Sequence, residues 1–182
     1  TMKSIKRLCL LVLILSVYSG ITFSQDIGSK QKHDRYKMPV LPDINKMLGN
    51  PNTNPLSVIK QDFFLTLRDN ALMDASKFYP SQPNPYLPNG YPVVIMVHGY
   101  GDRKEVLEGF ASAQAQYGYV VYTYSVRGQG NSTGLSNLIS RTEAQDLIEF
   151  VDYVKGDKPN TGSDTSKVMI MGGSQGGMLP YM

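Results

Sequence analysis

The sequence predicts an α/β fold built on a parallel β-sheet. Three short apolar runs, at residues 93–97, 119–126 and 168–171, have the composition of strands buried on both faces. Segments with helical periodicity separate them. Strands that alternate with helices over short connections form right-handed βαβ units, so we expect the three strands to lie parallel in one sheet.

Two helices are expected between these strands. The first covers residues 104–117 and ends before Gly118, and the second begins at a capping box formed by Ser140 and Glu143 and ends at Gly156. Each has an apolar stripe at steps of three and four residues. The stripes are Val106, Leu107, Phe110 and Ala111 in the first helix, and Ala144, Leu147, Ile148, Val151 and Val154 in the second.

The first 79 residues are expected to contain three segments. Residues 1–24 have the basic start, apolar middle and small residues of a signal peptide, with cleavage between Ser24 and Gln25, which predicts a secreted or periplasmic protein. The apolar run 8–17 is shorter than the roughly 20 residues of a bilayer-spanning helix, so no stable membrane anchor is expected. Residues 25–57 form an irregular lead-in, and 58–67 with 72–79 form a β-hairpin.

Composition excludes several classes of function. The chain has 18 basic and 15 acidic residues, and the leader holds three of the basic ones, so the remainder is close to neutral and no nucleic-acid partner is expected. The single cysteine, Cys9, lies in the leader. Disulfides, cysteine metal sites and a cysteine nucleophile are therefore excluded from the mature chain, and neither a metal nor an organic cofactor is expected.

Two stretches match the pattern Gly-x-Ser-x-Gly, which is typical of a serine nucleophile. One is 130–134 around Ser132, and the other is 172–176 around Ser174. A nucleophile elbow needs the serine on a sharp turn between a buried strand and a helix. Ser174 directly follows the apolar run 168–171, whereas Ser132 lies in a loop with no helical pattern behind it. We therefore predict Ser174 as the nucleophile of an acyl transfer, with a plain Gly-rich turn as the alternative.

A serine nucleophile also needs an oxyanion hole and a base. The backbone N–H of Gln175 is one expected oxyanion donor, and the second is expected from the loop 98–101, through the backbone or hydroxyl of Tyr100; the alternative for Tyr100 is a packed loop aromatic. His98 precedes Ser174 and is more simply explained as a residue that orients its loop. In folds with a nucleophile elbow, the catalytic residues follow one another along the chain in the order serine, acid, histidine. Asp102, Asp146 and Asp152 also precede Ser174 and are interpreted as solvated.

The acid and the histidine are accordingly expected beyond Met182, and residues 58–182 are expected to form an incomplete, truncated domain. Taken alone, the 182 residues are expected to be inactive. The strand 168–171 is expected to self-associate through an unpaired apolar edge.

Residues from about 60 to 182 resemble the Xaa-Pro dipeptidyl-peptidase/cocaine-esterase-like family of α/β-hydrolases. The resemblance rests on Arg68-Asp69 and on residues 93–100, 118–121, 127–134 and 172–177. It implies that Ser174 is the nucleophile and that the Tyr100 hydroxyl helps to form the oxyanion hole. Two positions depart from the family: Ser125 replaces an Asp that anchors the loop 127–134, and Gln175 replaces a Tyr, which implies an altered substrate preference.

The predicted function is therefore that of a serine hydrolase that forms an acyl-enzyme on Ser174. Its substrate is a small-molecule ester or amide, or a peptide, and release of Xaa-Pro dipeptides is one option. The alternatives are a non-catalytic, hydrolase-like binding module or inactive fragment, and, within the class, a lipase-like or carbohydrate esterase.

Overall fold

The computed structural model describes residues 39–49 and 54–182. The expected signal peptide with its Ser24–Gln25 cleavage site and Cys9 lies outside these described residues. Within the described part of the chain, no helix combines the length and apolarity needed to cross a membrane.

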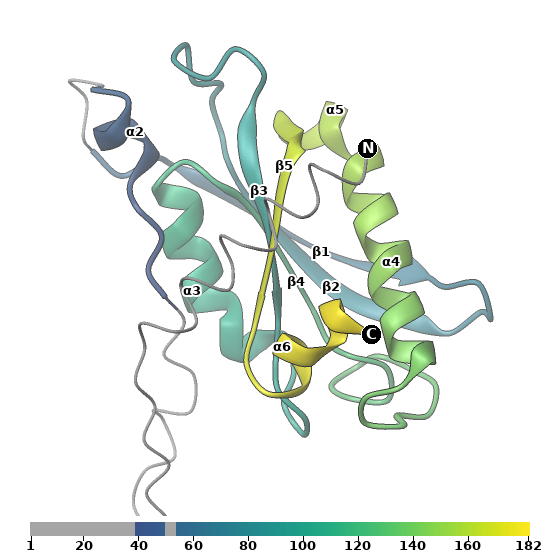
Figure 1. The fold of residues 1–182 in the computed structure, drawn as a ribbon. Coiled ribbons are helices and arrows are strands. Elements are labelled where there is room, and N and C mark those ends of the chain that lie inside the picture. Colours follow the sequence, from purple (N-terminus) through teal and green to yellow (C-terminus); the bar gives the residue numbers. More distant parts are fainter. Residues whose placement is uncertain (1–38, 50–53) are drawn as a thin grey trace, which may run out of the picture. The chain divides into compact units, whose positions relative to one another are not determined.

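The described residues form a mixed five-stranded sheet with the strand order β1-β2-β4-β3-β5 (Figure 1). The strands are β1 (Val58–Thr66), β2 (Leu72–Pro80), β3 (Tyr91–Val97), β4 (Val120–Tyr124) and β5 (Ser163–Gly172). The first two form the expected antiparallel hairpin, and β2 pairs antiparallel with β4. Strands β3, β4 and β5 are mutually parallel, as predicted.

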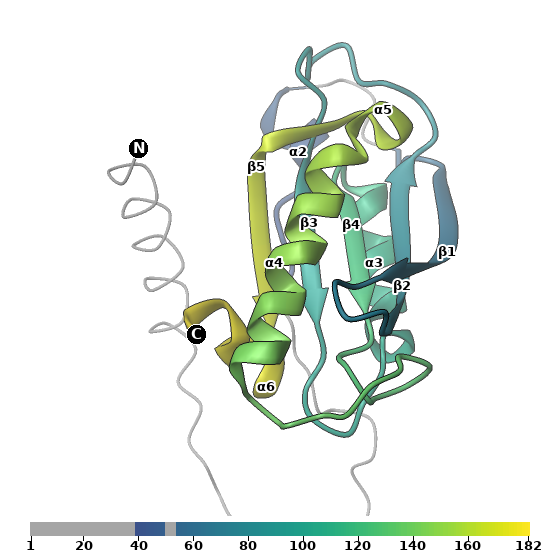
Figure 2. The same cartoon turned by 90° about the vertical axis from the view of Figure 1, so that its right-hand side faces the viewer.

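The two long helices cover opposite faces of the sheet (Figure 2). They are α3 (Glu105–Gln116), between β3 and β4, and α4 (Arg141–Gly156), between β4 and β5. The chain steps from β3 to β4 in one direction and from β4 back past β3 to β5 in the other. Because βαβ crossovers are right-handed, reversing the direction of the step moves the helix to the other face.

Each face has its own hydrophobic core, and β3 contributes to both. Val93, Ile95 and Val97 belong to the cluster that contains α4, whereas Val94 and Met96 belong to the cluster that contains α3. Successive side chains of a strand point to opposite faces, so a strand covered on both sides needs an unbroken apolar run. The core of the fold was therefore predicted correctly from residues 93–97.

The predicted helix stripes were wrong at two positions. Val106 is 41% exposed and Ile148 is 53% exposed, while Phe150, which the predicted stripe omits, is completely buried. Phe150 packs between Tyr122 and Tyr124 of β4 and Phe63 of β1. Compared with the predicted stripe, helix α4 is therefore rotated about its axis so that Phe150 faces the aromatic side chains of the sheet and Ile148 faces away from it.

The strand β5 also differs from the prediction. It begins at Ser163 rather than at residue 168. Of residues 168–171, which were predicted to be buried, Met171 is buried and the other three are half-buried. Its only partner among the described strands is β3. A strand at the edge of a sheet keeps one side open, so its side chains are covered less completely than those of β3.

The lead-in includes a short helix and a core residue. Residues Ile44–Met47 form the short helix α2, whose N-cap Asp43 accepts hydrogen bonds from the next turn. Ile44 is buried in the α3-side core, and its N–H donates to the carbonyl of Tyr117. The lead-in thus contributes to the core, which its polar composition did not predict.

Candidate active site

Three loops leave the sheet side by side at the carboxyl ends of its parallel strands. Val97, the last residue of β3, pairs with Tyr124, the last of β4, and with Gly172, the last of β5. The loops that begin at His98, Ser125 and Gly173 therefore start at one edge of the sheet. In open α/β sheets this is the edge at which ligands bind.

Ser174 occupies the turn from β5 into the short helix α6 (Gln175–Met178). Its backbone has φ 52° and ψ −121°, a region that residues with a side chain rarely adopt. The residue is exposed and makes no side-chain capping hydrogen bond to the helix. A strained turn thus holds a free hydroxyl above the sheet edge, as a nucleophile elbow requires.

The glycines on either side of Ser174 are needed for close backbone packing. A Cβ added to Gly172 would lie 2.4 Å from the carbonyl carbon of Gly176. A Cβ on Gly176 would lie 2.2 Å from the carbonyl oxygen of Val97. Any side chain at either position would collide with backbone, so the elbow packs against the end of β3 and beside the loop that follows it.

Ser132, the serine of the other motif, has a structural role. It is buried; its hydroxyl donates to the carbonyl of Ser125 at 2.6 Å and accepts from the N–H of Asp74 at 2.9 Å. Both contacts tie the loop after β4 to neighbouring backbone. A hydroxyl engaged in this way is not available to attack a substrate.

His98 is also engaged on both sides of its ring. The ring is fully buried, Nδ1 lies 2.7 Å from the carbonyl oxygen of Gly99, and Nε2 accepts from the N–H of Val126 at 2.9 Å. These partners require a neutral ring with its proton on Nδ1. Burial lowers the pKa of His98, outweighing the opposite effects of Gly99 and nearby carboxylates. His98 therefore orients its loop, as expected, and has no nitrogen free to act as a base.

Tyr100 and Gln175 are the residues from which the two oxyanion donors are expected. Tyr100 is 60% exposed, so the alternative of a packed loop aromatic is wrong. Gln175 is the first residue of α6, and the N–H groups of a first helical turn have no acceptor within the helix. Their roles as oxyanion donors stay predictions.

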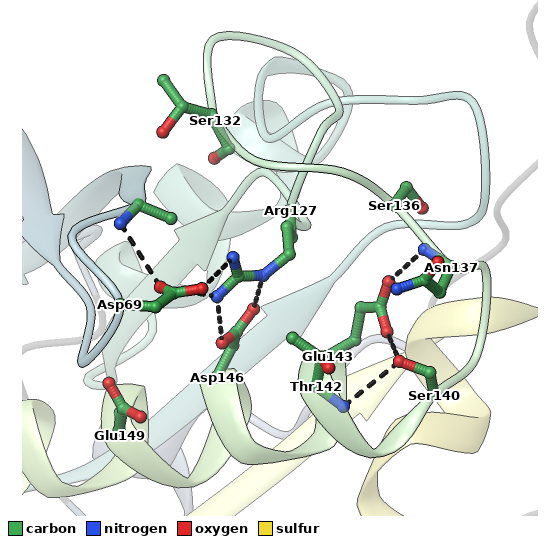
Figure 3. A network of polar contacts seen from close by, with 12 residues as sticks. Asp69, Arg127, Ser132, Ser136, Asn137, Ser140, Thr142, Glu143, Asp146 and Glu149 are labelled. Carbon is green, nitrogen blue, oxygen red and sulfur yellow. Dashed lines mark hydrogen bonds and ion pairs between the residues drawn. The ribbon is translucent and has the colours of Figure 1, made fainter.

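The loop after β4 is anchored by a buried arginine (Figure 3). The guanidinium of Arg127 donates to Asp146 of α4, through Nε at 2.7 Å and Nη2 at 2.8 Å, and to Asp69 in the β1–β2 turn, through Nη1 at 2.6 Å and Nη2 at 3.1 Å. Arg68 adds a further contact to Asp146. The hydrogen bonds from Arg127 are the main cause that lowers the pKa of Asp69 to about 2.

Ser125 joins this anchoring. Its buried hydroxyl accepts from the N–H of Lys104 at 3.0 Å, and its carbonyl accepts from Ser132. The loop is therefore held without the Asp expected at this position. At the other end of the loop, Glu143 accepts from the N–H of Asn137 and from the hydroxyl of Ser140 (Figure 3).

The prediction that Asp146 is solvated was wrong, because only 1% of the residue is exposed. A signal for its burial was present: Asp146 lies beside the stripe that carries Leu147 and Phe150, three residues after Glu143. Asp152 is exposed and Asp102 half-exposed. No group of three or more potential metal ligands occurs among residues 39–49 and 54–182.

A mixed sheet whose parallel strands β4, β3 and β5 lie side by side, with β5 ending in a strained Gly-x-Ser-x-Gly elbow beside the loop after β3, defines an α/β-hydrolase fold. The comparisons with known proteins agree. Residues 90–181, just over half of the chain, match the profile of the serine aminopeptidases of family S33, and the chain belongs to this family. No curated protein matched the chain in sequence.

Several solved structures share the fold. Brefeldin A esterase, described as a bacterial homologue of human hormone-sensitive lipase, is 20% identical, with a TM-score of 0.55 over 71% of this chain and 35% of that one. The esterase Pf2001 of Pyrococcus furiosus is 19% identical, with a TM-score of 0.54 over 78% and 49%. The thioesterase domain from the curacin biosynthetic pathway is 19% identical, with a TM-score of 0.51 over 66% and 38%. The chain thus spans between a third and a half of the length of these structures.

Two groups of residues around the elbow were not predicted from the sequence. One is the Arg127–Asp69–Asp146 network, although Arg68-Asp69 and the Arg127 loop both stand in the stretches that carry the family resemblance. The other is Gln129, whose side chain lies between the loop after β3 and the elbow. A glutamine in a Gly-rich loop has no pattern that would identify it.

Proposed function

We propose that the protein containing this chain is a serine hydrolase that cleaves an ester, or an amide or peptide bond, through an acyl-Ser174 intermediate. The observation that carries the proposal is the conformation of Ser174, an exposed serine at φ 52° and ψ −121° between β5 and α6. The backbone strain of such a turn persists where the surrounding structure holds it, and it is common at reactive residues. The membership in family S33 and the esterase and thioesterase neighbours support the same chemistry.

In the proposed reaction, the Ser174 hydroxyl oxygen attacks the carbonyl carbon of the substrate and transfers its proton to a histidine. The resulting oxyanion accepts hydrogen bonds from the N–H of Gln175 and from Tyr100. The leaving alcohol or amine takes the proton from the histidine as the tetrahedral intermediate collapses, and water then hydrolyses the acyl-enzyme. No cofactor is needed for any of these steps.

The histidine of this reaction is proposed to follow Ser174 in the full-length protein, with the acid between them. His98 is the histidine of the described residues, and both of its ring nitrogens are engaged by backbone groups. The order serine, acid, histidine is that of α/β-hydrolases generally.

The substrate class is proposed from two sources. The resemblance to Xaa-Pro dipeptidyl-peptidases and cocaine esterase favours a peptide N-terminus or an acyl ester, and the name of family S33 also points to a peptide N-terminus. The leader at residues 1–24 supports export, so the substrate is proposed to be met outside the cytoplasm.

The test is hydrolysis of two substrate sets by the full-length protein: p-nitrophenyl esters of increasing acyl length, and anilides of Xaa-Pro dipeptides and of single amino acids. Ser174→Ala is expected to abolish turnover of every substrate that the wild type cleaves. Ser132→Ala, corrected for the folded fraction, is expected to retain it. A folded wild type that cleaves none of these substrates would favour the non-catalytic binding module, and Ser174-independent hydrolysis would exclude the proposed nucleophile.

A further inference from the structure

Two glutamine side chains connect all three loops at the edge of the sheet. The N–H of Gly101, in the loop after β3, donates to Oε1 of Gln129 at 2.6 Å. Nε2 of Gln129, in the loop after β4, donates to Oε1 of Gln175 at 2.9 Å. Nε2 of Gln175, in the elbow, donates to the carbonyl of Leu138. Both glutamines are buried, with 8% and 1% exposed.

The direction of this chain of hydrogen bonds is set by its two ends. Gly101 offers a backbone N–H, which only donates, and Leu138 offers a carbonyl, which only accepts. Each amide between them must therefore present its oxygen toward Gly101 and its nitrogen toward Leu138. Turning over either amide would bring two donors or two acceptors together in a buried site, which is costly.

Leu138, which accepts the last of these hydrogen bonds, has a strained backbone. Leu138 has φ 70°, a conformation that is uncommon for a side chain of its size. Its carbonyl accepts from Gln175, and its neighbour Asn137 donates its N–H to Glu143. Strained backbone persists where several contacts hold it, so the Gln175 amide is part of what fixes this loop beside the elbow.

We propose that Gln129, with Gln175 as its partner, is the positioning residue that holds the oxyanion loop 99–101 in register with the Ser174 elbow. The inference rests on the proposed function. An oxyanion donor works only at hydrogen-bond distance from the oxygen of the transition state, so its loop must be fixed relative to the nucleophile. The backbone contact of Gly176 with Val97 fixes the start of that loop, and the Gln129–Gly101 hydrogen bond fixes its far side.

The position of Gln175 follows from the same arrangement. Its side chain is buried between Gln129 and Leu138 and does not reach solvent. The Gln175 side chain thus orders loops and leaves contact with the oxyanion to the backbone N–H of the same residue. Its effect on substrate preference is expected to be indirect.

The test compares three variants of the full-length protein. Gln129→Met keeps the length of the side chain and removes both hydrogen bonds, whereas Gln129→Glu keeps an acceptor for Gly101 and loses the donor to Gln175. Gln61→Met, on the exposed strand β1, is the matched control. The readouts are kcat and KM on the best ester, the rate of fluorophosphonate labelling, and hydrogen exchange at the Gly101 amide.

Gln129→Met is expected to lower kcat by roughly tenfold to a hundredfold with KM within about threefold, as for a misplaced donor. Gln129→Glu is expected to lower kcat similarly, while the Gly101 amide exchanges faster in Gln129→Met and stays protected in Gln129→Glu. If the substitutions only loosened the fold, the Gly101 amide would exchange faster in both Gln129→Met and Gln129→Glu. If Gln129→Met fails to fold, the kcat and the labelling rate of Gln129→Glu decide whether Gln129 positions the loop 99–101.

Wild-type kcat in a folded Gln129 variant, or a loss confined to KM, would overturn the inference and leave the proposed function intact. A wild type that is neither labelled nor active would overturn the proposed function instead. Unchanged kinetics in Gln61→Met are required for the comparison, and a loss there equal to that of Gln129→Met would also overturn the assignment.

Discussion

Replacing Arg127 by methionine tests whether the buried network holds the loop after β4. The side chain is 5% exposed and makes four hydrogen bonds, two of them to Asp146, whose side chain is 2% exposed. Removing one partner of a buried ion pair costs about 3–5 kcal/mol, because the other charge stays buried. Arg68 remains 2.8 Å from Asp146, so we expect the lower end, about 3 kcal/mol.

The matched control is Arg68→Met, which removes a 38%-exposed side chain from the same carboxylate. It is expected to cost only about 1 kcal/mol, as exposed ion pairs do. Thermal unfolding of the full-length protein followed by circular dichroism measures both, and the fall in Tm is expected to be about three times larger for Arg127→Met than for Arg68→Met. Equal losses, or a loss under about 2 °C for Arg127→Met, would refute the view that Arg127 is the central contact of the loop.

Three further predictions concern single residues. The Asp69 carboxyl is expected to titrate with a pKa of about 2 by NMR, and its pKa should return toward 4 in Arg127→Met. Because the pKa of Asp69 is lowered in the folded state, the stability that this carboxylate contributes is present above pH 4 and is lost as the pH falls toward 2. Gly176→Ala places a Cβ 2.2 Å from a carbonyl oxygen of β3, so Ser174 labelling by a fluorophosphonate should slow by about a hundredfold, whereas Gly109→Ala, with no atom within 4 Å of the new Cβ, should label normally. Tyr100→Phe should lower kcat by roughly 10²–10³ with stability nearly unchanged if its hydroxyl is an oxyanion donor, and a kcat within a few-fold of wild type would remove that role.

The elements that position the site were predictable because they obey short-range rules. An unbroken apolar run at residues 93–97 is required of a strand covered on both faces, and the structure confirms it as β3. The choice of Ser174 over Ser132 likewise depended on a local context, strand then turn then helix, and the backbone of Ser174 agrees with it.

The features that were missed depend on contacts between distant segments. The first five residues of β5 are polar, so they gave no strand signal, although Ser163 and Asp164 are buried. Asp146 was interpreted as solvated because its partner Arg127 lies outside helix α4, on the loop after β4. The Gln129–Gln175 pair joins residues 46 positions apart, and neither residue type nor spacing predicts such a contact.

The central claim, that Ser174 is the nucleophile, is tested most directly by locating the covalent adduct. The full-length protein is incubated with a fluorophosphonate, digested, and its peptides are sequenced by mass spectrometry. A single stoichiometric adduct is expected on Ser174; it should be absent from Ser174→Ala and persist in Ser132→Ala. An adduct on Ser132 or on any other residue, or ester hydrolysis that survives in Ser174→Ala, would contradict it.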